Sequence, residues 1–419
     1  MQTNLSPEYQ NTADGQEAEA ILRKCVHCGF CTATCPTYQL LGDELDGPRG
    51  RIYLIKQVLE GETPTRDTQL HLDRCLTCRN CETTCPSGVQ YGHLVDIGRK
   101  LVDEKVPRPA SEQAVRWALK EGLNSPVFAP AMKLGQAVRG LLPGGIKAKV
   151  PEARSAGHWP KQTHARKVLM LAGCVQPAMS PNINSATARV LDACGMQTVV
   201  EPLAGCCGGV KFHLNDQDAA IVQMKNNIDA WWPHVAQGVE AIVMNASGCG
   251  VTVKDYGHIL RNDAAYADKA KRISELTKDL SELLPHLLPD LQKRIQPQAA
   301  QAQGLMAFHP PCTLQHGQQL KGGVETHLNA LGFKLRVATN EAHLCCGSAG
   351  TYSVLQPVIA TQLRDRKLGH LNEMQPKAIL SANIGCITHL QSGTPVPVRH
   401  WIEMVDAALL TSAAHSSAA

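Results

Sequence analysis

The 17 cysteines of this 419-residue chain constrain its fold more than any other feature, because they form two separate repeats. The first is Cys25-x2-Cys28-x2-Cys31-x3-Cys35-Pro36, which recurs fifty residues later as Cys75-x2-Cys78-x2-Cys81-x3-Cys85-Pro86. The second comprises Cys174, Cys206-Cys207-Gly208 and Cys249, which recur as Cys312, Cys345-Cys346-Gly347 and Cys386 at offsets of 137 to 139 residues. Near-constant offsets indicate internal duplication. Cys194 stands outside both repeats and is predicted to be a core residue.

Composition places these cysteines in a folded chain that is not secreted. Hydrophobic residues make up 43% and charged residues 19%, which predicts a packed core rather than disorder. The first twenty residues are polar and acidic, so we expect no signal peptide, and the apolar runs are far shorter than the roughly 20 residues that span a bilayer. Thiols stay reduced in such a chain, which favours metal ligation or redox chemistry. The net charge of +4 is too small to make nucleic acid the expected partner.

The N-terminal runs have the spacing of bacterial ferredoxin motifs, in which three cysteines hold one [4Fe–4S] cluster and the fourth serves the other cluster. This spacing predicts two clusters. The first would be held by Cys25, Cys28, Cys31 and Cys85, and the second by Cys75, Cys78, Cys81 and Cys35. The alternative is structural zinc, which usually takes two separated ligand pairs, and not four cysteines in one run that ends in proline.

The later cysteines offer four thiols in each half of the duplication. Adjacent cysteines are often only small buried residues, but two Cys-Cys-Gly sites at matched offsets favour a metal or redox role. We therefore predict a third redox centre at one or both groups. Its ligands would come from Cys174, Cys206, Cys207, Cys249, Cys312, Cys345, Cys346 and Cys386. The nearby His309, His343 and His389 have no counterparts in the other half, and we interpret them as packing or hydrogen-bonding groups.

Hydrophobic periodicity predicts different architectures on the two sides of residue 165. Helices are predicted over 17–24 and 51–60, so the first cysteines lie in loops of a small helical unit. Beyond residue 165 short apolar runs alternate with helical segments, which is typical of parallel sheets. The predicted strands are 168–171, 198–200, 241–244, 305–308, 335–338 and 378–380. The later cysteines then follow the carboxyl ends of strands, where open α/β sheets place their ligands.

The expected fold class is α+β, with an N-terminal α-helical two-cluster ferredoxin-like domain followed by a duplicated α/β Cys-Cys-Gly domain. The predicted segments are the helical domain at 15–104, a basic helical linker at 105–165, the first repeat at 166–261, a helical insertion at 262–303, the second repeat at 304–405 and a flexible tail at 406–419. Residues 105–167 hold twelve Lys or Arg and three Glu. This surplus is either a solvated face or a docking surface for anionic lipid or an acidic partner.

The motifs together resemble a known family. The two ferredoxin runs, Gly47-Pro48-Arg49-Gly50-Arg51, Asn245-Ala246-Ser247-Gly248-Cys249 and Phe308-His309-Pro310-Pro311-Cys312 are similar to those of iron–sulfur subunits of bacterial glycolate oxidase. The resemblance covers about residues 15–405 and extends to subunits of anaerobic glycerol-3-phosphate dehydrogenase, lactate-utilisation proteins and heterodisulfide reductase. The family motif ends in Cys-x2-Cys, but this chain has Ala246 and Asn383 at the first of those positions. The departure argues against a five-cysteine non-cubane cluster and leaves one further [4Fe–4S] cluster, or none.

The resemblance implies an electron-transfer subunit without catalytic residues of its own. Two flavin-binding partner subunits would carry FAD and oxidise glycolate to glyoxylate, and this chain would pass the electrons towards a membrane quinone. The lone chain is expected to be inactive, cytoplasmic and peripheral on the cytoplasmic face of the inner membrane. The alternatives are the same role in glycerol-3-phosphate or lactate oxidation, a heterodisulfide-reductase-like thiol or disulfide enzyme, and a zinc-stapled scaffold.

Overall fold

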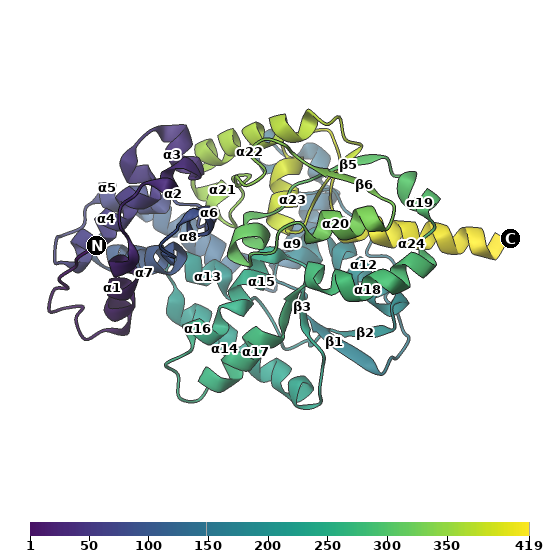
Figure 1. The fold of residues 1–419 in the computed structure, drawn as a ribbon, viewed down its shortest axis with the longest axis horizontal. Helices are drawn as coiled ribbons and strands as arrows, with labels where there is room; N and C mark the ends of the chain where they lie inside the picture. Colours follow the sequence, from purple (N-terminus) through teal and green to yellow (C-terminus); the bar gives the residue numbers. More distant parts are fainter. Residues whose placement is uncertain (148, 419) are drawn as a thin grey trace.

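The structure is a computed structural model that describes residues 1–147 and 149–418. A helical N-terminal domain forms one end of the molecule, two α/β repeats form the rest, and the C-terminal helix projects at the opposite end (Figure 1). The fold is mixed helix and sheet, as expected. Among the described residues, no helix combines the length and the apolar character that crossing a membrane requires.

The N-terminal domain packs eight short helices around one apolar core. They are α1 (Ala13–Lys24), α2 (Phe30–Ala33), α3 (Pro36–Leu41), η1 (Glu44–Asp46), α4 (Pro48–Leu59), α5 (Arg66–Asp73), α6 (Asn80–Thr84) and α7 (Tyr91–Lys105). Ile55 of α4 is fully buried against α7, and a Cβ on Gly98 would lie 2.5 Å from its side chain. This close helix contact holds the two cysteine runs on a rigid base.

Each α/β repeat contains a four-stranded parallel sheet. The first has the order β2-β1-β3-β4 and the second the order β6-β5-β7-β8. The strands are β1 (Arg166–Met170), β2 (Met196–Val199), β3 (Ile242–Met244), β4 (Thr277–Asp279), β5 (Leu305–Phe308), β6 (Lys334–Val337), β7 (Ala378–Ser381) and β8 (Val398–His400). The identical strand order is what a duplication produces, and the six predicted strands are all present to within two residues at their ends.

Helices cover these sheets and join the two repeats. Those of the first repeat are α11 (Gln176–Met179), α12 (Pro181–Ala193), α13 (Gly209–His213), α14 (Gln217–Ala236), α15 (Ser247–Lys254), α16 (Tyr256–Ile259) and α17 (Ala267–Leu276). Between the sheets lie α18 (Leu280–Arg294) and α19 (Pro297–Gln301), and the second repeat adds the π-helical turn η3 (Thr313–Gly317), α20 (Gly323–Ala330), α21 (Tyr352–Leu355), α22 (Pro357–Asn372), α23 (Ile384–Gln391) and α24 (Trp401–Ala418). One continuous apolar core includes residues of both repeats, so they form a single body.

Two segments differ from the sequence-based prediction. The expected helical insertion at 262–303 contains α17, α18 and α19, but also β4, which pairs with β3 and completes the first sheet. Neither β4 (TKD) nor β8 (VRH) contains an apolar run, so periodicity gave no sign of them. The predicted flexible tail at 406–419 is instead the continuation of α24 to Ala418, because Val405 and Ala408 are buried in the shared core.

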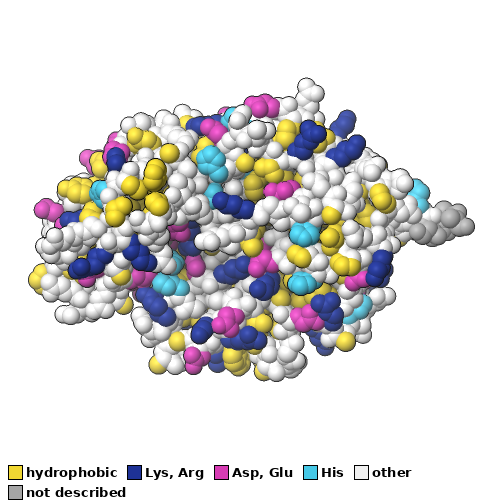
Figure 2. Space-filling view, in the orientation of Figure 1, with side chains coloured by type: hydrophobic (Ala, Val, Ile, Leu, Met, Phe, Trp, Pro, Cys, Tyr) yellow, Lys and Arg dark blue, Asp and Glu magenta, His cyan; other side chains and the backbone are white. Residues whose placement is uncertain are grey.

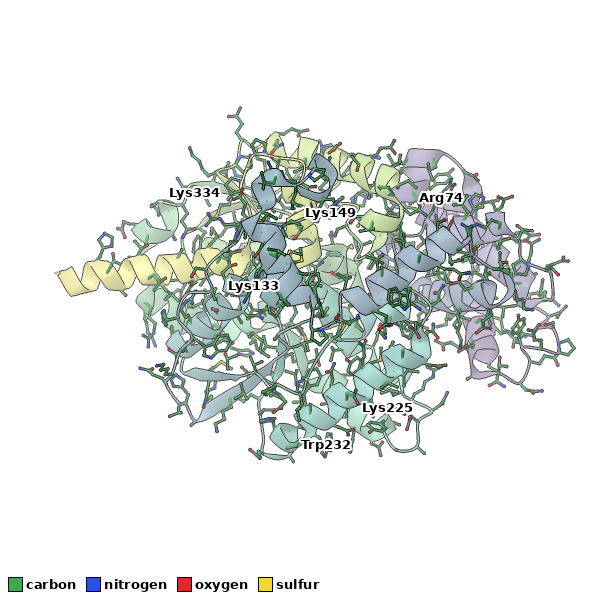
Figure 3. The ribbon with its side chains drawn as sticks, turned by 180° about the vertical axis from the view of Figure 1, so that it is seen from behind. Arg74, Lys133, Lys149, Lys225, Trp232 and Lys334 are labelled. Atoms are coloured by element: carbon green, nitrogen blue, oxygen red, sulfur yellow. The ribbon has the colours of Figure 1, made fainter. Side chains whose placement is uncertain are left out.

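The linker crosses the back of the molecule over both repeats (Figure 3). Its helical part comprises α8 (Ala110–Gly122), α9 (Phe128–Ala137), η2 (Arg139–Leu141) and α10 (Gly144–Lys147), and residues 151–165 are irregular. Much of its positive charge is neutralised by ion pairs within the chain. The paired residues are Lys105, Arg108, Arg116, Lys120, Arg139, Arg154 and Arg166. Lys133 and Lys147 form no ion pair with the residues that the structure describes.

A buried ion network lies beneath the second cysteine run. Gly47-Pro48 begins α4, and a Cβ on Gly50 would lie 2.1 Å from the Glu44 carbonyl oxygen, so this glycine permits the close turn. The guanidinium of Arg51, 1% exposed, donates to Asp46, to the Thr37 hydroxyl and to the His71 carbonyl oxygen. Asp46 is fully buried and also pairs with Arg74 and His71.

We predict that Asp46→Asn destabilises the chain by about 3–5 kcal/mol, because it leaves the Arg51 guanidinium buried without its counter-charge. The midpoint of denaturant unfolding, followed by circular dichroism under anaerobic conditions, should fall clearly. The matched control is Glu44→Gln, which breaks the half-exposed Arg49–Glu44 pair and should cost at most about 1 kcal/mol. Equal midpoints for the two variants would contradict the proposed importance of the buried network.

Candidate metal centres

The first candidate site is a pocket at the outer end of the N-terminal domain. The cysteines that line it are Cys25, Cys28, Cys31, Cys81 and Cys85. Burial and the neighbouring Cys25 raise the pKa of the Cys31 thiol to about 11, and Cys85 and Cys28 act on it in the same direction. The structure thus brings Cys85 from the second run next to the three leading cysteines of the first run. A thiol of this kind binds metal as the thiolate, so a bound cation would be required to hold it ionised.

The second candidate site lies deeper and is lined by Cys35, Cys75, Cys78 and Cys81. Here Cys35 comes from the first run and the others come from the second run. The hydroxyl of Tyr91 lies 3.6 Å from Cys75 Sγ. Both pockets share Cys81, Tyr91 and Pro48 in their walls, so the two sites are immediate neighbours.

The backbone of the two cysteine runs repeats the same rare conformation. His27 and Thr77, which occupy matching positions, have φ of 55° and 51°. Gly29 and Arg79, which also match, have φ of 87° and 56°. Positive φ is unfavourable for residues other than glycine and persists where the surrounding structure enforces it, often at functional sites. The strain therefore marks both loops as preorganised around something they bind.

The two sites differ in how far their cysteines are exposed to solvent. Cys28 is exposed, and its neighbours Val26 and Phe30 are 68% and 61% exposed. Hydrophobic side chains gather on this face of the N-terminal domain (Figure 2). In contrast, Cys75 and Cys81 of the second site are buried. The outer site thus faces solvent, and the inner site faces the two repeats.

The N-terminal domain docks on both repeats through polar contacts around the inner site. Arg79 pairs with Asp255 of the first repeat at 2.7 Å. Asn80 Nδ2 donates to the His343 carbonyl oxygen of the second repeat. Burial lowers the pKa of Arg79, but the charges of Asp255 and Glu82 have the larger effect and raise this pKa above its usual value. A charged guanidinium therefore lies beside the inner cysteines.

In the first repeat the later cysteines converge within one apolar cluster. That cluster contains Cys206 and Cys207, with Cys174 and Cys249 packed against it. Hydrogen bonds from the Cys174 and Cys207 thiols hold the pKa of Cys206 well below its usual value, and the backbone N–H groups of Gly208 and Val210 add to this. The loop therefore stabilises one thiolate among four neighbouring sulfurs.

In the second repeat the matching cysteines lie against the N-terminal domain. Cys312 Sγ lies 3.8 Å from Cys345 Sγ, and the Gly347 N–H donates to Cys345 Sγ. Cys78 of the inner site packs against the apolar cluster that holds Cys312 and Cys345. The inner site therefore adjoins the second repeat. Cys346 and Cys386 of that repeat lie in the core shared by both repeats, whereas the cysteines of the first repeat lie in a cluster of their own.

The glycine of each Cys-Cys-Gly loop has a structural reason. Gly208 and Gly347 have φ of 88° and 86°. A Cβ on Gly347 would lie 2.4 Å from the Ala360 carbonyl oxygen of α22. The glycine thus lets the helix approach the loop and fixes the two preceding sulfurs at the end of the sheet.

The two positions at which the family motif would carry a further cysteine meet at the contact between the repeats. The Ser247 N–H donates to the Ala382 carbonyl oxygen, and the Gly248 N–H donates to Asn383 Oδ1. Asn383 Nδ2 lies 3.7 Å from Cys386 Sγ and donates to it. In this chain the Asn383 amide therefore accepts a hydrogen bond from the other repeat and donates one to a cysteine, and a thiol is weaker in both roles.

Two polar residues near the cysteines were not indicated by the sequence. Tyr91 follows a proline-containing loop, and nothing in its neighbourhood predicts that it lines both N-terminal sites. Lys367 is buried on α22 and donates to the Glu341 carbonyl oxygen, with Cys345 and Cys346 nearby. Burial lowers the pKa of Lys367 to about 8, although those cysteines raise it. Its position in an ordinary charged helix segment (RDRK) gives no signal.

The donor chemistry fits iron–sulfur clusters. All 17 cysteines are free thiols, and eight of them line two adjoining pockets in the N-terminal domain. Sulfur-rich sites with little polar lining are the environment in which such clusters are held. The ligand role of each individual cysteine remains a prediction.

Comparison with known proteins agrees with this chemistry. A family model described as a 4Fe-4S dicluster domain matches residues 21–89, and one described as a cysteine-rich domain matches residues 168–254 and 306–391. The glycolate oxidase iron–sulfur subunit of Escherichia coli (strain K12) is 55% identical over 411 residues, which is 98% of this chain and 99% of that protein. A probable glycolate oxidase iron–sulfur subunit of Bacillus subtilis (strain 168) is 28% identical over 92% of both chains.

A more distant relative covers only part of the chain. Lactate utilization protein A of Geobacillus thermodenitrificans (strain NG80-2) is 27% identical and spans 57% of this chain and 98% of its own length. The Escherichia coli and Bacillus subtilis relatives, which match over most of their length, both carry the glycolate oxidase name. With two cysteine-rich repeats, a 4Fe-4S dicluster domain and a full-length relative at 55% identity, this chain belongs to the family of glycolate oxidase iron–sulfur subunits.

Proposed function

We propose that this oxidoreductase subunit carries electrons one at a time between flavin-bearing partner subunits and an acceptor at the membrane. The observation that supports the proposal best is the unbroken succession of cysteine groups, from the exposed outer site through the inner site to the second repeat. Bound iron–sulfur clusters supply one-electron transfer, which splits the two-electron oxidation of a flavin-dependent reaction. The residues of this chain hold those groups close together and exclude water from the inner ones.

The ligand assignment is part of this proposal. Cys25, Cys28, Cys31 and Cys85 would hold the outer [4Fe–4S] cluster, and Cys75, Cys78, Cys81 and Cys35 would hold the inner one. The lining of the two pockets supports the exchange of Cys35 and Cys85 between the runs, because each appears only in the pocket of the other run.

The substrate assignment rests on the full-length relatives. Their names favour glycolate over lactate, so the proposed reaction of the complex is oxidation of glycolate to glyoxylate by two flavin-binding partners with FAD, and quinone is the proposed acceptor. The exposed apolar residues around Cys28 would form the contact through which electrons enter or leave.

We further propose that the linker docks on an anionic membrane surface. Nearly half of the large exposed hydrophobic residues in the described part of the chain lie in it. They are Val115, Trp117, Val127, Leu134, Val138, Leu141, Ile146 and Trp159. Lys133 and Lys147 lie among them without an ion pair to the described residues, so apolar and cationic groups share this surface.

We predict that the anaerobically purified chain binds at least eight irons and that Cys75→Ser loses about four of them, since a [4Fe–4S] cluster needs all of its thiolates. Iron analysis and the visible spectrum before and after dithionite give the measurement. Cys194→Ser is the matched control, because Cys194 is a buried core residue outside all four cysteine groups. Stoichiometric zinc with almost no iron in the wild type would overturn the assignment.

Glycolate should bleach the visible spectrum of this chain only when flavin-bearing partner subunits are present. The expected result is no reduction by glycolate alone and rapid reduction after the partners are added. Phe30→Glu should slow the reduction at least tenfold if the exposed loop is the contact, whereas Val222→Asp, on the exposed face of α14, should not. Glycolate oxidation by the isolated, flavin-free chain would refute the proposed division of labour.

Docking of the linker should depend on its unpaired lysines. Changing Lys133 and Lys147 to Gln is expected to weaken binding to anionic lipid vesicles roughly thirty-fold at low salt, because each lysine near such a surface contributes about 1 kcal/mol. Leu134→Asp with Leu141→Asp should abolish binding, and added salt should weaken wild-type binding. Arg139→Gln is the control, because its charge already pairs with Glu152. Identical partitioning of all variants would show that the linker is only a solvated surface.

A further inference from the structure

His309 is a buried imidazole that lacks a hydrogen-bonding partner. It follows the last residue of β5, it is 1% exposed, and neither of its ring nitrogens has a hydrogen-bond partner among the described residues. The sequence-based interpretation gave this histidine a packing or hydrogen-bonding role, and its ring forms no hydrogen bond with the described residues. By contrast, Nε2 of the neighbouring His389 lies 3.1 Å from the Ala360 carbonyl oxygen. Because buried polar atoms in native proteins are nearly always satisfied, the two free nitrogens of His309 call for a ligand.

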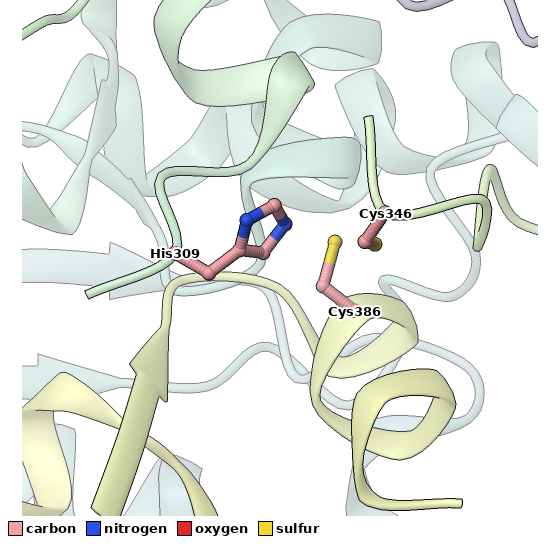
Figure 4. A group of neighbouring side chains, drawn as sticks. All are labelled: His309, Cys346 and Cys386. Carbon is pink, nitrogen blue, oxygen red and sulfur yellow. The ribbon is translucent and has the colours of Figure 1, made fainter. Parts of the chain in front are cut away.

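The imidazole points towards two sulfurs of the second repeat. Figure 4 shows the ring of His309 facing Cys386 and Cys346, which come from α23 and from the Cys-Cys-Gly loop. One nitrogen of His309 and the two Sγ atoms all lie within 4.8 Å of one another, and all three residues are buried. Imidazole nitrogen and cysteine sulfur bind a metal at about 2.0–2.3 Å, so three donors gathered in so small a volume can converge on one atom.

The feature is specific to the second repeat. The offset of 138 residues between Cys312 and Cys174 places Leu171 at the position that matches His309. Leu171 is a buried member of the apolar cluster in the first repeat. The duplicated fold therefore accepts an ordinary hydrophobic residue at this position, and packing alone does not account for an imidazole in the other copy.

We propose that His309, Cys346 and Cys386 bind one iron atom of a redox centre in the second repeat. Imidazole and thiolate are both suitable ligands for iron. Cys345, adjacent to Cys346, and Cys312, 3.8 Å from Cys345, extend the ligand group towards Cys78 of the inner N-terminal site. This inference rests on the proposed function: the centre takes up one electron as Fe(III) becomes Fe(II), and the cluster at the inner site gives up that electron.

A histidine ligand also favours electron transfer towards this centre. Imidazole binds as a neutral ligand, whereas cysteine binds as an anion, and replacing thiolate by imidazole raises the potential of iron–sulfur centres. The buried Lys367 adds positive charge beside Cys345 and Cys346. The centre in the second repeat therefore has the higher reduction potential and accepts electrons from the N-terminal sites.

The experiment uses the full chain, purified anaerobically, with and without ¹⁵N-labelled histidine. Pulsed electron paramagnetic resonance of the reduced wild type should show a nitrogen coupling that changes with the label. His309→Leu, which installs the residue of the first repeat, should lose this coupling and part of the iron while keeping the eight irons of the N-terminal sites. His309→Cys should keep the iron, lose the coupling and titrate at a lower midpoint potential.

The matched control is His343→Gln, two residues before Cys345, because the hydrogen bonds of His343 with the described residues are accepted by its backbone carbonyl oxygen. It should leave the coupling, the iron content and the potential unchanged. If the wild type holds eight irons but shows no histidine coupling, or if it holds zinc at this site, the proposal for His309 is overturned and the proposed function stands. If the wild type lacks the eight irons, the proposed function itself fails. The labelled wild type decides the question even if His309→Leu does not fold.

Discussion

Repulsion between neighbouring thiolates is the constraint on which the rest of this structure depends. Sixteen cysteines form four close groups, and sulfurs that lose their protons to bind metal repel one another in a site with little water. The chain places buried cations next to two of these groups: Arg51 and Arg79 lie beside the inner N-terminal site, and Lys367 lies beside the second repeat. A buried cation needs its own partner, and Asp46, Asp255 and the Glu341 carbonyl oxygen supply it. The polar networks between the domains thus follow from the cysteines.

The sequence predicted what is decided locally. Cysteine spacing separated the four groups, and hydrophobic periodicity located six strands within a few residues, because both signals lie in short segments. The short strands β4 and β8 were not predicted, because their pairing depends on neighbouring strands and not on their own residues. The positions of Arg79 and Lys367 beside the cysteines were not predicted either, because tertiary packing brings each of them there. The tail after residue 405 was judged from its small residues, whereas its burial depends on a core formed far upstream.

Duplication has produced two copies with the same sheet order and different surroundings. The second copy packs Cys312 and Cys345 against Cys78, whereas the first keeps its cysteines in a separate apolar cluster and supplies Asp255 to Arg79 instead. Asn383 lies at the contact between the copies, where its amide accepts from the Gly248 N–H and donates to Cys386 Sγ. Shared topology therefore does not make the two groups equivalent, and residues such as His309 and Leu171 distinguish them.

The contacts around the inner N-terminal site also bear on the biosynthesis of the chain. Arg79 pairs with Asp255, which is synthesised 176 residues later. Asn80 donates to the His343 carbonyl oxygen, which is synthesised 263 residues later. At the usual rates of translation, the second interval corresponds to roughly 13–50 s. During that time the helical domain has emerged from the ribosome, but Cys312 and Cys345 of the second repeat, which belong to the cluster against which Cys78 packs, do not yet exist. The contacts that fix the N-terminal domain on the two repeats therefore form only after most of the chain has been made.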